Sequence, residues 1–298
     1  MKSRLMWIAA ALAVAGPAHA EERKINIAIF APNTAFASGS ERFSYVNRLA
    51  QHVTSVAGVK AEGKAFARAG DLEAAIKAKQ VDFAILDGVY LAERGAPYPV
   101  LAVATTGGET APKWALFTSG STDAKGLQGK RLAMARVGAR DDDFLSNALF
   151  DGEVQVKKFF ASRVDAPDLA GALATVNLKK AEAVFAPESE GKGLKNVFEA
   201  GRIPNPAFCD LQNGTPSDVV AKVRSAVLAY SAGAALEGWK PSDAGAYRAL
   251  SGRMSARNRR PVMAEPTVVK LEDLDVLVPP QFEAAQPDLR ALFLVPLP

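Results

Sequence analysis

The sequence predicts an α/β protein built of two lobes. From Lys24 onward, short apolar runs alternate with segments of helical periodicity, a pattern typical of mostly parallel sheets flanked by helices. The alternation starts again at Gly129, after a stretch over 107–129 that is rich in Gly, Ser and Thr. A chain of 298 residues is long enough for about two domains. We therefore expect two similar α/β units joined by an ordered connection.

Residues 1–20 predict a signal peptide that is removed on export. Lys2 and Arg4 precede an apolar run, and Ala18-His19-Ala20 is a small-residue cleavage site. The run is shorter than the ~20 residues that a membrane-spanning helix needs, and no Cys follows it. We expect a periplasmic protein that begins at Glu21 and is neither a lipoprotein nor inserted in the membrane. An uncleaved N-terminal anchor is the alternative.

Composition excludes several kinds of site. Loss of Lys2 and Arg4 with the signal lowers the formal net charge from +4 to +2, which disfavours a nucleic-acid partner. The single Cys209 allows neither an internal disulfide nor a thiolate cluster, and is expected to be a buried thiol. His52 is the one histidine left after export, so zinc sites with several imidazoles are excluded, whereas the sequence leaves an oxygen-ligand site for calcium or magnesium open. No metal and no cofactor are expected.

Catalytic motifs are equally sparse. A Ser-His-Asp triad would have to use His52, which lies in a helical pattern and is expected to pack at the surface or a helix end. Ser189 and Lys192 fit a Ser-x-x-Lys pattern, but its companion motifs do not occur. We therefore expect a binding protein and not an enzyme. A hydrolase using Ser189 and Lys192 is the least favoured alternative.

The elements of the first unit follow from periodicity and turn residues. Alternating or continuous apolar runs predict strands, and runs of helical period predict helices, the second of them capped by Asp71. The predicted strands are 24–31, 59–67, 81–86 and 100–104, and the predicted helices are 40–56 and 71–79.

The second unit repeats this pattern. Its predicted strands are 113–118, 129–135, 154–160 and 181–185, and its predicted helices are 142–150 and 167–176. Pro204 and Pro206 force extended backbone, which marks a crossing back to the first unit. Pro216 opens a helix predicted over 217–235. The Pro-rich tail from Met254 is expected to be an extended segment packed over the body.

These segments define the predicted domains. After the signal peptide at 1–20, the first lobe is formed by 21–107 and 209–298, the second lobe by 108–208, and the hinge crossings lie near 105–118 and 203–210.

Loops at the carboxyl ends of the predicted strands carry the candidate binding residues. Ligands of parallel α/β sheets bind at these ends, where helix N-termini present free N–H groups. The first such loop and the helix after it supply Asn33, Thr34, Ser38, Ser40 and Tyr45. One of the two serines alternatively does no more than cap that helix.

Two further loops and two single residues complete the candidate set. Asp87 and Tyr90 follow the 81–86 strand, where Asp87 either faces a cleft or caps a helix. Arg140 and Asp141 open the first helix of the second unit, where acidic residues either complement the helix dipole or suit a cationic ligand. The remaining candidates are Glu188, and Trp114, which alternatively fills the hinge core.

Several of these segments carry a family resemblance. Lys125–Ala133 opens the second unit with Leu127, Gly129, Lys130 and Arg131, and the return crossing reads Ile203-Pro-Asn-Pro-Ala-Phe208 before a helix over 218–224. Residues 81–88 form a last core strand and loop of the first unit. Together with the export signal, they make the chain similar to the type II periplasmic solute-binding proteins, and within them to the phosphonate/phosphite-binding (PhnD-like) branch.

The resemblance implies a two-lobe fold, a small ligand in the cleft and an inner-membrane ABC transporter as partner. Phosphonate-binding members place Gly, Ser and Thr at the first helix of the second lobe, where hydroxyl and N–H groups hold the anion. Here that position reads Gly138-Ala-Arg-Asp-Asp-Asp143, with no hydroxyl before Ser146. A carboxylate disfavours a neighbouring oxyanion. A polar, cationic or apolar solute is therefore as compatible with the sequence as a phosphonate-like one.

We therefore expect a periplasmic solute-binding protein that closes its lobes on a small molecule. Closure is expected to bring the first-lobe candidates against Arg140, Asp141 and Glu188. The alternative is a lipid- or apolar-ligand-handling or protein-interaction subunit of the periplasm that keeps the fold. The Pro-rich tail and the acidic loop of the second lobe favour that alternative.

Overall fold

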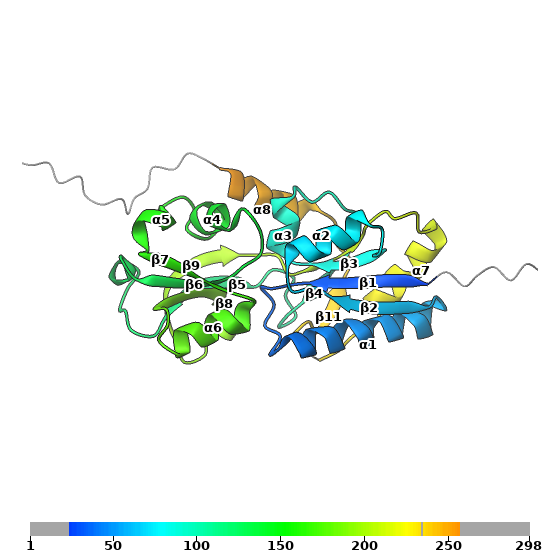
Figure 1. Cartoon of the computed structure of the whole chain (residues 1–298), viewed down its shortest axis with the longest axis horizontal. Coiled ribbons are helices and arrows are strands. Elements are labelled where there is room, and N and C mark those ends of the chain that lie inside the picture. The colour runs from blue at the N-terminus through cyan, green and yellow to red at the C-terminus, as the bar shows by residue number, and fades with distance from the viewer. Residues whose placement is uncertain (1–23, 234, 257–298) are drawn as a thin grey trace, which may run out of the picture. The chain divides into compact units, whose positions relative to one another are not determined.

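The protein contains two mixed sheets, each flanked by helices (Figure 1). The structure is a computed structural model and describes residues 24–233 and 235–256. The predicted signal peptide and nearly all of the Pro-rich tail lie outside the described residues. The α/β fold class predicted from the sequence is confirmed.

The first sheet has the strand order β2-β1-β3-β10-β4-β11. β1 runs parallel to β2 and β3, whereas β10 runs antiparallel to both β3 and β4. The strands are β1 (Ile25–Phe30), β2 (Ala61–Ala65), β3 (Phe83–Leu86), β4 (Val100–Thr105), β10 (Ala207–Asp210) and β11 (Gly238–Lys240). The helices of this lobe are α1 (Gly39–Ala57), α2 (Ala69–Lys77), α3 (Gly88–Glu93) and α7 (Ser217–Leu228).

The second sheet has the strand order β7-β6-β8-β5-β9. β6 runs parallel to β7 and β8, and β5 pairs antiparallel with β8 and β9. The strands are β5 (Lys113–Thr118), β6 (Arg131–Ala135), β7 (Ser162–Ala166), β8 (Ala183–Pro187) and β9 (Lys195–Arg202). The helical segments are η1 (Lys125–Leu127), α4 (Asp141–Asp143), the π-helical η2 (Phe144–Leu149), α5 (Val156–Phe159), α6 (Leu169–Asn177) and η3 (Glu188–Glu190).

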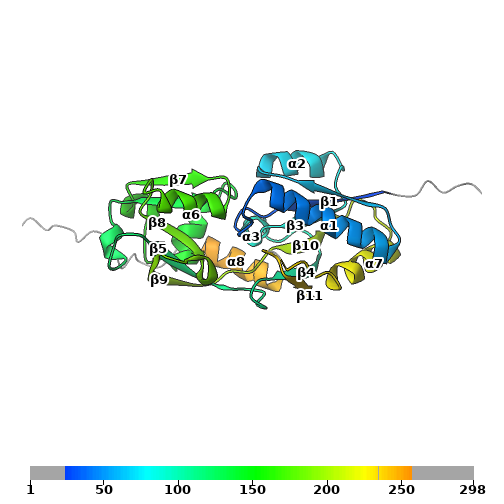
Figure 2. The same ribbon diagram turned by 90° about the horizontal axis from the view of Figure 1, so that it is seen from below.

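Two extended segments connect the sheets side by side. Ile203 N donates to Pro112 O at 3.2 Å, and Asn205 N donates to Thr110 O at 2.8 Å. The helix α8 (Gly245–Ser255) packs against both α3 and η2, and so contacts both lobes (Figure 2). The backbone therefore links the lobes twice, through 106–112 and 203–206, and α8 links them once more through packing.

Local sequence explains where the long first helix begins and ends. The Ser38 hydroxyl accepts from Glu41 N at 3.1 Å, which satisfies one free N–H of the first turn. Gly58 has φ +66°, a left-handed conformation that glycine adopts without strain, and its N–H closes the last turn. Tyr45, Leu49 and Val53 lie on the face that is buried against the sheet.

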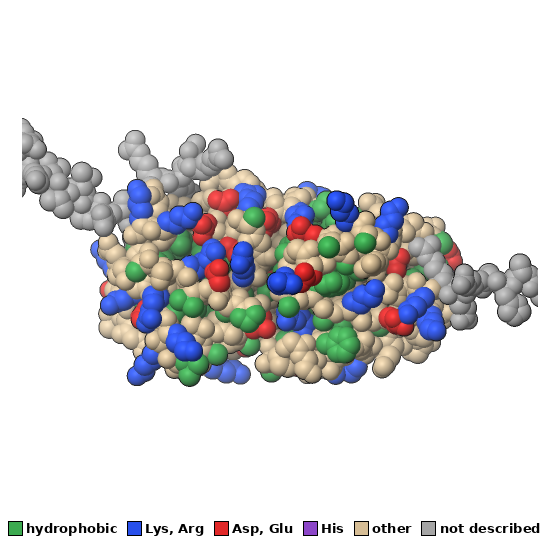
Figure 3. Space-filling view, viewed as in Figure 1, with side chains coloured by type: hydrophobic (Ala, Val, Ile, Leu, Met, Phe, Trp, Pro, Cys, Tyr) green, Lys and Arg blue, Asp and Glu red, His purple; other side chains and the backbone are tan. Residues whose placement is uncertain are grey.

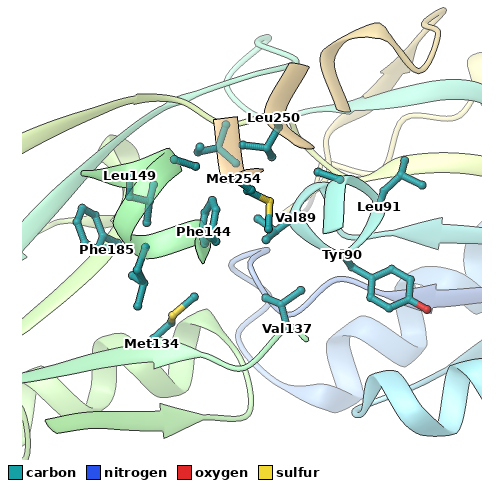
Figure 4. Packing of buried hydrophobic residues seen from close by; sticks show 14 of the residues in the cluster. Val89, Tyr90, Leu91, Met134, Val137, Phe144, Leu149, Phe185, Leu250 and Met254 are labelled. Atoms are coloured by element: carbon teal, nitrogen blue, oxygen red, sulfur yellow. The ribbon is translucent and has the colours of Figure 1, made fainter. Parts of the chain in front are cut away.

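One continuous apolar cluster extends from the first lobe into the second. Val89 of α3 lies in the same buried cluster as Val137 and Phe144 of the second lobe and Met254 of α8 (Figure 4). At about 25 cal/mol per Å² of buried apolar surface, this packing contributes to holding the lobes together. The lobes are therefore in direct contact along α3.

The predicted strand at 154–160 in the second lobe is wrong, and the predicted helix at 142–150 is helical but not a regular α-helix. The predicted strand at 154–160 contains the helix α5, because Val156, Phe159 and Phe160 are buried at the i, i+3, i+4 spacing of a helix. The strand of this region is instead β7, an edge strand that the prediction missed. The predicted helix at 142–150 is a short α-helical turn followed by the π-helical η2.

Predictions for other segments need further correction. α7 ends at Leu228 and not at residue 235. Asp71 lies in the first turn of α2 and does not cap it, since Arg68 occupies the N-cap position. The strands β9, β10 and β11 and the helix α8 were not predicted. β10 lies inside the segment interpreted as a hinge crossing, because two neighbouring strands supply its hydrogen-bond partners.

Charged side chains of both signs are interspersed over the face shown in Figure 3. On this face, Lys and Arg do not gather into one basic area, which agrees with the small net charge. Among the residues that the structure describes, no helix is long and apolar enough to cross a membrane.

Gly88 lies where α3 meets the return crossing, and its replacement tests this contact. A Cβ atom there would collide with Pro204 O and would lie 3.2 Å from the Pro204 carbonyl carbon. We expect Gly88→Ala to lower the free energy of unfolding by about 1–3 kcal/mol, the usual cost of overpacking, as measured by urea denaturation. Gly252→Ala, in α8 with open space around it, should leave stability unchanged or raise it by up to about 1 kcal/mol. Equal stabilities of the two variants would contradict the close approach.

Candidate functional site

A cavity of about 250 Å³ lies between the two lobes, beside the paired crossing segments. Its volume corresponds to roughly eight water molecules at about 30 Å³ each. The lining comes from the ends of β1, β3, β4 and β8 and from both crossings. The residues are Asn33, Thr34, Ala35, Asp87, Gly88, Val89, Thr106, Gly107, Pro112, Trp114, Pro187, Ser189, Glu190, Ile203, Pro204, Asn205, Pro206, Ala235 and Glu237. We call it the hinge cavity.

Asp87 organises the first-lobe side of the hinge cavity. Its Oδ2 accepts from Asn33 N at 2.9 Å, and its Oδ1 accepts from Asn33 Nδ2 at 3.2 Å and from Val89 N at 2.9 Å. The side chain is 1% exposed, and burial raises the pKa of Asp87 while these hydrogen bonds oppose the shift. One carboxylate therefore fixes both the 31–36 loop and the start of α3. Asp87 therefore caps α3 and also lines the cavity, so both sequence interpretations of this residue apply.

The return crossing, residues 203–206, lines the hinge cavity between the lobes. Asn205 is 8% exposed, and its Nδ2 donates to Ala104 O at 3.2 Å and to Glu109 O at 2.9 Å. Its backbone oxygen accepts from the Tyr247 hydroxyl at 2.9 Å. Pro204 and Pro206 have no N–H to donate, so the Asn205 side chain supplies the donors for the carbonyl groups of Ala104 and Glu109.

The second lobe contributes an aromatic and a polar side to the cavity. Trp114 is the second residue of β5, is 4% exposed and packs edge-on against Phe144 with ring centroids 6.3 Å apart. Ser189 and Glu190 follow β8, and the Ser189 hydroxyl donates to Glu190 Oε1 at 3.3 Å. The cavity thus combines an indole, hydroxyl groups and carboxylates.

The structure places four of the predicted site residues together in this cavity: Asn33, Thr34, Asp87 and Trp114. Ser38 and Ser40 are exposed at the start of α1, where Ser38 is the cap. Tyr45 is buried in the first-lobe core, where its hydroxyl accepts from Trp239 Nε1 at 3.2 Å and burial raises its pKa. These three side chains do not line the hinge cavity, since α1 carries them away from it or into the core.

The other predicted residues lie in different surroundings. Tyr90 lines a second interlobe cavity of about 870 Å³, where its ring lies under the Arg94 guanidinium at 4.7 Å and burial raises its pKa to about 12. Figure 4 shows its side chain pointing away from Phe144. Arg140 pairs with Asp143 at 2.8 Å and also donates to the Ser255 hydroxyl. Glu188 is exposed in η3.

Asp141 fills the start of the first helix of the second lobe. It is 2% exposed and accepts from Val137 N at 3.3 Å and Gly138 N at 3.1 Å. Burial raises the pKa of Asp141 to about 6, and the charge of Glu93 adds to the shift while the two N–H bonds and Arg163 oppose it.

Glu93 of α3 reaches the same place from the first lobe. Its Oε1 accepts from Ala139 N at 3.1 Å, and its Oε2 is buried without a hydrogen-bond partner in the described structure. Gly138 permits this approach, because a Cβ atom there would lie 2.7 Å from Glu93 Cδ. The N–H groups of Val137, Gly138 and Ala139, just before this helix, are therefore occupied by two carboxylates of the chain itself. This arrangement disfavours an added oxyanion.

Sequence reasoning missed the residues that the tertiary structure brings to the cavity from the crossings. Thr106, Asn205 and Glu237 have no local motif, and Glu237 follows a helix that was predicted to run to residue 235. The Pro204 and Pro206 pattern was the one available signal, and it was interpreted only as a hinge.

The side chains of Ser189, His52 and Cys209, which were considered for catalysis, pack against or bind other parts of the chain. The Ser189 hydroxyl donates a hydrogen bond to Glu190, and within the described residues it forms none with Lys192. His52 Nε2 lies 3.0 Å from Ala226 O and joins α1 to α7. Cys209 is fully buried, as predicted, and burial raises the pKa of its thiol. Among the described residues, no group of three His, Cys, Asp or Glu side chains is arranged to hold a metal ion.

The structure of this chain is similar to those of several solved proteins. The PhnD1 protein of Prochlorococcus marinus in complex with methylphosphonate superposes with a TM-score of 0.60 and 11% identity, over 77% of this chain and 96% of that chain. The chain has the type II periplasmic-binding-protein fold. The recognition of this fold from the sequence is thereby confirmed.

Two further solved proteins share this fold. The binding protein component of an ABC phosphonate transporter from Pseudomonas aeruginosa has a TM-score of 0.56 and 13% identity, over 75% of this chain and 82% of that chain. A Xanthomonas citri protein bound to ATP has a TM-score of 0.56 and 13% identity, over 78% of this chain and 96% of that chain. No protein-family model matches the sequence, and a search of curated proteins gives no significant match.

The raised pKa of Asp141 predicts a pH-dependent contribution to stability. The folded protein holds a proton on Asp141 more tightly than the unfolded chain does, so deprotonation favours unfolding. The measured quantity is the free energy of unfolding of the natural protein minus that of Asp141→Asn. This difference should decrease by roughly 3 kcal/mol as the pH is raised from 3.8 to about 6, and it should not change further at higher pH. Asp143→Asn, on the same turn, controls for loss of a carboxylate. A difference between natural protein and Asp141→Asn that does not vary with pH would contradict the raised pKa.

The contact between Glu93 and Ala139 predicts an effect on amide exchange. Gly138→Ala must push the Glu93 carboxylate away, which frees the Ala139 N–H. Its hydrogen exchange should accelerate by about tenfold, as expected for loss of one hydrogen bond to a charged group. Glu93→Ala removes the same bond without altering residue 138 and should give the same acceleration. Unchanged exchange of the Ala139 amide in both variants would show that the contact does not persist in solution.

Proposed function

We propose that the protein is a solute-binding protein that holds a small molecule in the hinge cavity. The observation that carries the proposal is the origin of the lining: first lobe, second lobe and both crossings all contribute to it. A ligand in this position contacts both lobes, so its binding energy favours the closed arrangement over an open one. Capture of this kind requires no chemical step.

The size of the cavity supports a small solute. About 250 Å³ lies below the 300–1,000 Å³ typical of sites for drug-sized ligands. Such a volume does not accommodate a long acyl chain. The alternative of a lipid-handling subunit therefore has less support from the cavity than a small-solute binder does.

The proposal also concerns where the protein acts. A signal peptide over 1–20 supports export to the periplasm, and the shared fold supports delivery of the solute to an inner-membrane transporter. Asn33, Thr34, Asp87 and Trp114 are the proposed ligand contacts among the residues predicted from the sequence, and Asn205 and Glu237 are added to them.

A thermal-shift screen of the chain from Glu21 tests the proposal. Amines, amino acids, polyols, phosphonates and a long-chain fatty acid are the test compounds. A bound solute at about one hundred times its Kd adds ~2.7 kcal/mol, which raises Tm by roughly 5–10 °C. In a Trp239→Phe background, the chain from Glu21 keeps Trp114 as its sole tryptophan, so the same solute should also change the Trp114 fluorescence.

Two alanine positions in one loop provide the matched variants. Ala35 lines the cavity, and Ala35→Phe should fill it and abolish the shift in Tm. Ala37 is exposed two residues further on and does not line it, so Ala37→Phe should keep the shift. Binding of the fatty acid alone, unaffected by Ala35→Phe, would favour the lipid-handling alternative. A screen in which no compound raises Tm would reject the proposal.

A further inference from the structure

The charges around the hinge cavity have a single sign. Asp87, Glu190 and Glu237 are the ionisable residues among those that line it, and this described lining contains no Lys or Arg. The carboxylate of Asp87 is already occupied by N–H groups of Asn33 and Val89. Glu190 and Glu237 therefore have more acceptor capacity left for a ligand than Asp87 has.

These two carboxylates come from opposite lobes and have acceptor capacity left. Glu237 Oε2 accepts from Gly108 N at 3.0 Å, and Glu190 Oε1 accepts from the Ser189 hydroxyl. Neither forms an ion pair within the described residues. A carboxylate offers about four lone-pair positions, so both remain able to accept hydrogen bonds from a cationic group.

The rest of the lining suits an apolar body attached to a charge. Trp114, Pro187 and Ile203 are buried and line the cavity, and together with Val89 they give it apolar walls. An indole beside carboxylates is the combination that attracts organic cations, through the ring quadrupole and through charge. An anion in the same place would meet two carboxylates and no neutralising side chain, which costs binding energy.

We propose that the solute of the hinge cavity is a small organic cation, an ammonium or guanidinium compound with a compact apolar body. This proposal rests on the proposed function, because it names the class of molecule that the same cavity holds. Because Glu237 belongs to the first lobe and Glu190 to the second, a positive charge in the cavity is attracted by both lobes, which favours lobe closure. Selection against anions follows from the same two carboxylates.

Calorimetric titration with matched compounds tests the charge requirement. The cations are tetramethylammonium, tert-butylammonium and methylguanidinium, tert-butanol is the uncharged counterpart of tert-butylammonium, and methylphosphonate is the anion. At least one cation should bind, tert-butylammonium should bind about tenfold more tightly than tert-butanol, and methylphosphonate should not bind. Added salt should weaken the binding of the cation.

Three isosteric variants locate the effect. Glu190→Gln and Glu237→Gln should each weaken binding of the cation by about fivefold and leave tert-butanol binding unchanged. Glu199→Gln is the matched control, since Glu199 is an exposed glutamate of β9 in the second lobe that does not line the cavity. A decrease of equal size in all three variants would overturn the assignment of Glu190 and Glu237.

The outcomes separate this proposal from the proposed function. If an uncharged or anionic compound binds, Ala35→Phe abolishes that binding, and no cation binds, solute binding stands and the cation is wrong. If tert-butanol binds as tightly as tert-butylammonium and the glutamine variants change nothing, the charge requirement is likewise wrong. If none of the cations and no compound of the wider screen binds, both proposals fail.

Discussion

The buried carboxylate of Asp87 is the interaction on which the interlobe region depends. It gathers the N–H groups of Asn33 and Val89, and thereby sets both the 31–36 loop and the start of α3 at the end of β3. Removing such a buried acceptor leaves several N–H groups without partners, which costs far more than a surface change does. The position of α3 then determines what the first lobe presents to the second.

α3 presents two kinds of side chain to the second lobe. Val89 joins Phe144 and Met254 in a common apolar cluster, and Glu93 reaches the amide of Ala139. Close packing along α3 leaves the hinge cavity on one side of this contact and the larger cavity beside Tyr90 on the other. The N–H groups just before α4 donate to Asp141 and Glu93 of the chain itself. The hinge cavity, on the other hand, is lined by the carboxylates of Glu190 and Glu237.

Local signals predicted the elements whose burial follows a simple period. β1 and α1 were predicted to within a residue or two, because Ile25 to Phe30 and the cap at Ser38 carry clear apolar and capping patterns. Predictions were wrong where tertiary contacts override such signals, as in α5, whose Val156, Phe159 and Phe160 also suit a strand. The candidate site divides in the same way. Asn33, Thr34 and Asp87 follow strands and were found, whereas Asn205 and Glu237 reach the cavity through long-range pairing.

The sequence by itself determined the α/β class, the restart of the pattern in a second lobe and the scarcity of catalytic groups. It also determined the run of three acids at 141–143. Only the tertiary structure decided which side chains share a cavity and which are withdrawn, such as Tyr45 into the core and Ser38 into a cap. The physical reason is that the cavity is enclosed by crossing segments far apart in sequence. Their mutual position is fixed by hydrogen bonds between Pro112 and Ile203 and between Thr110 and Asn205, which no local period encodes.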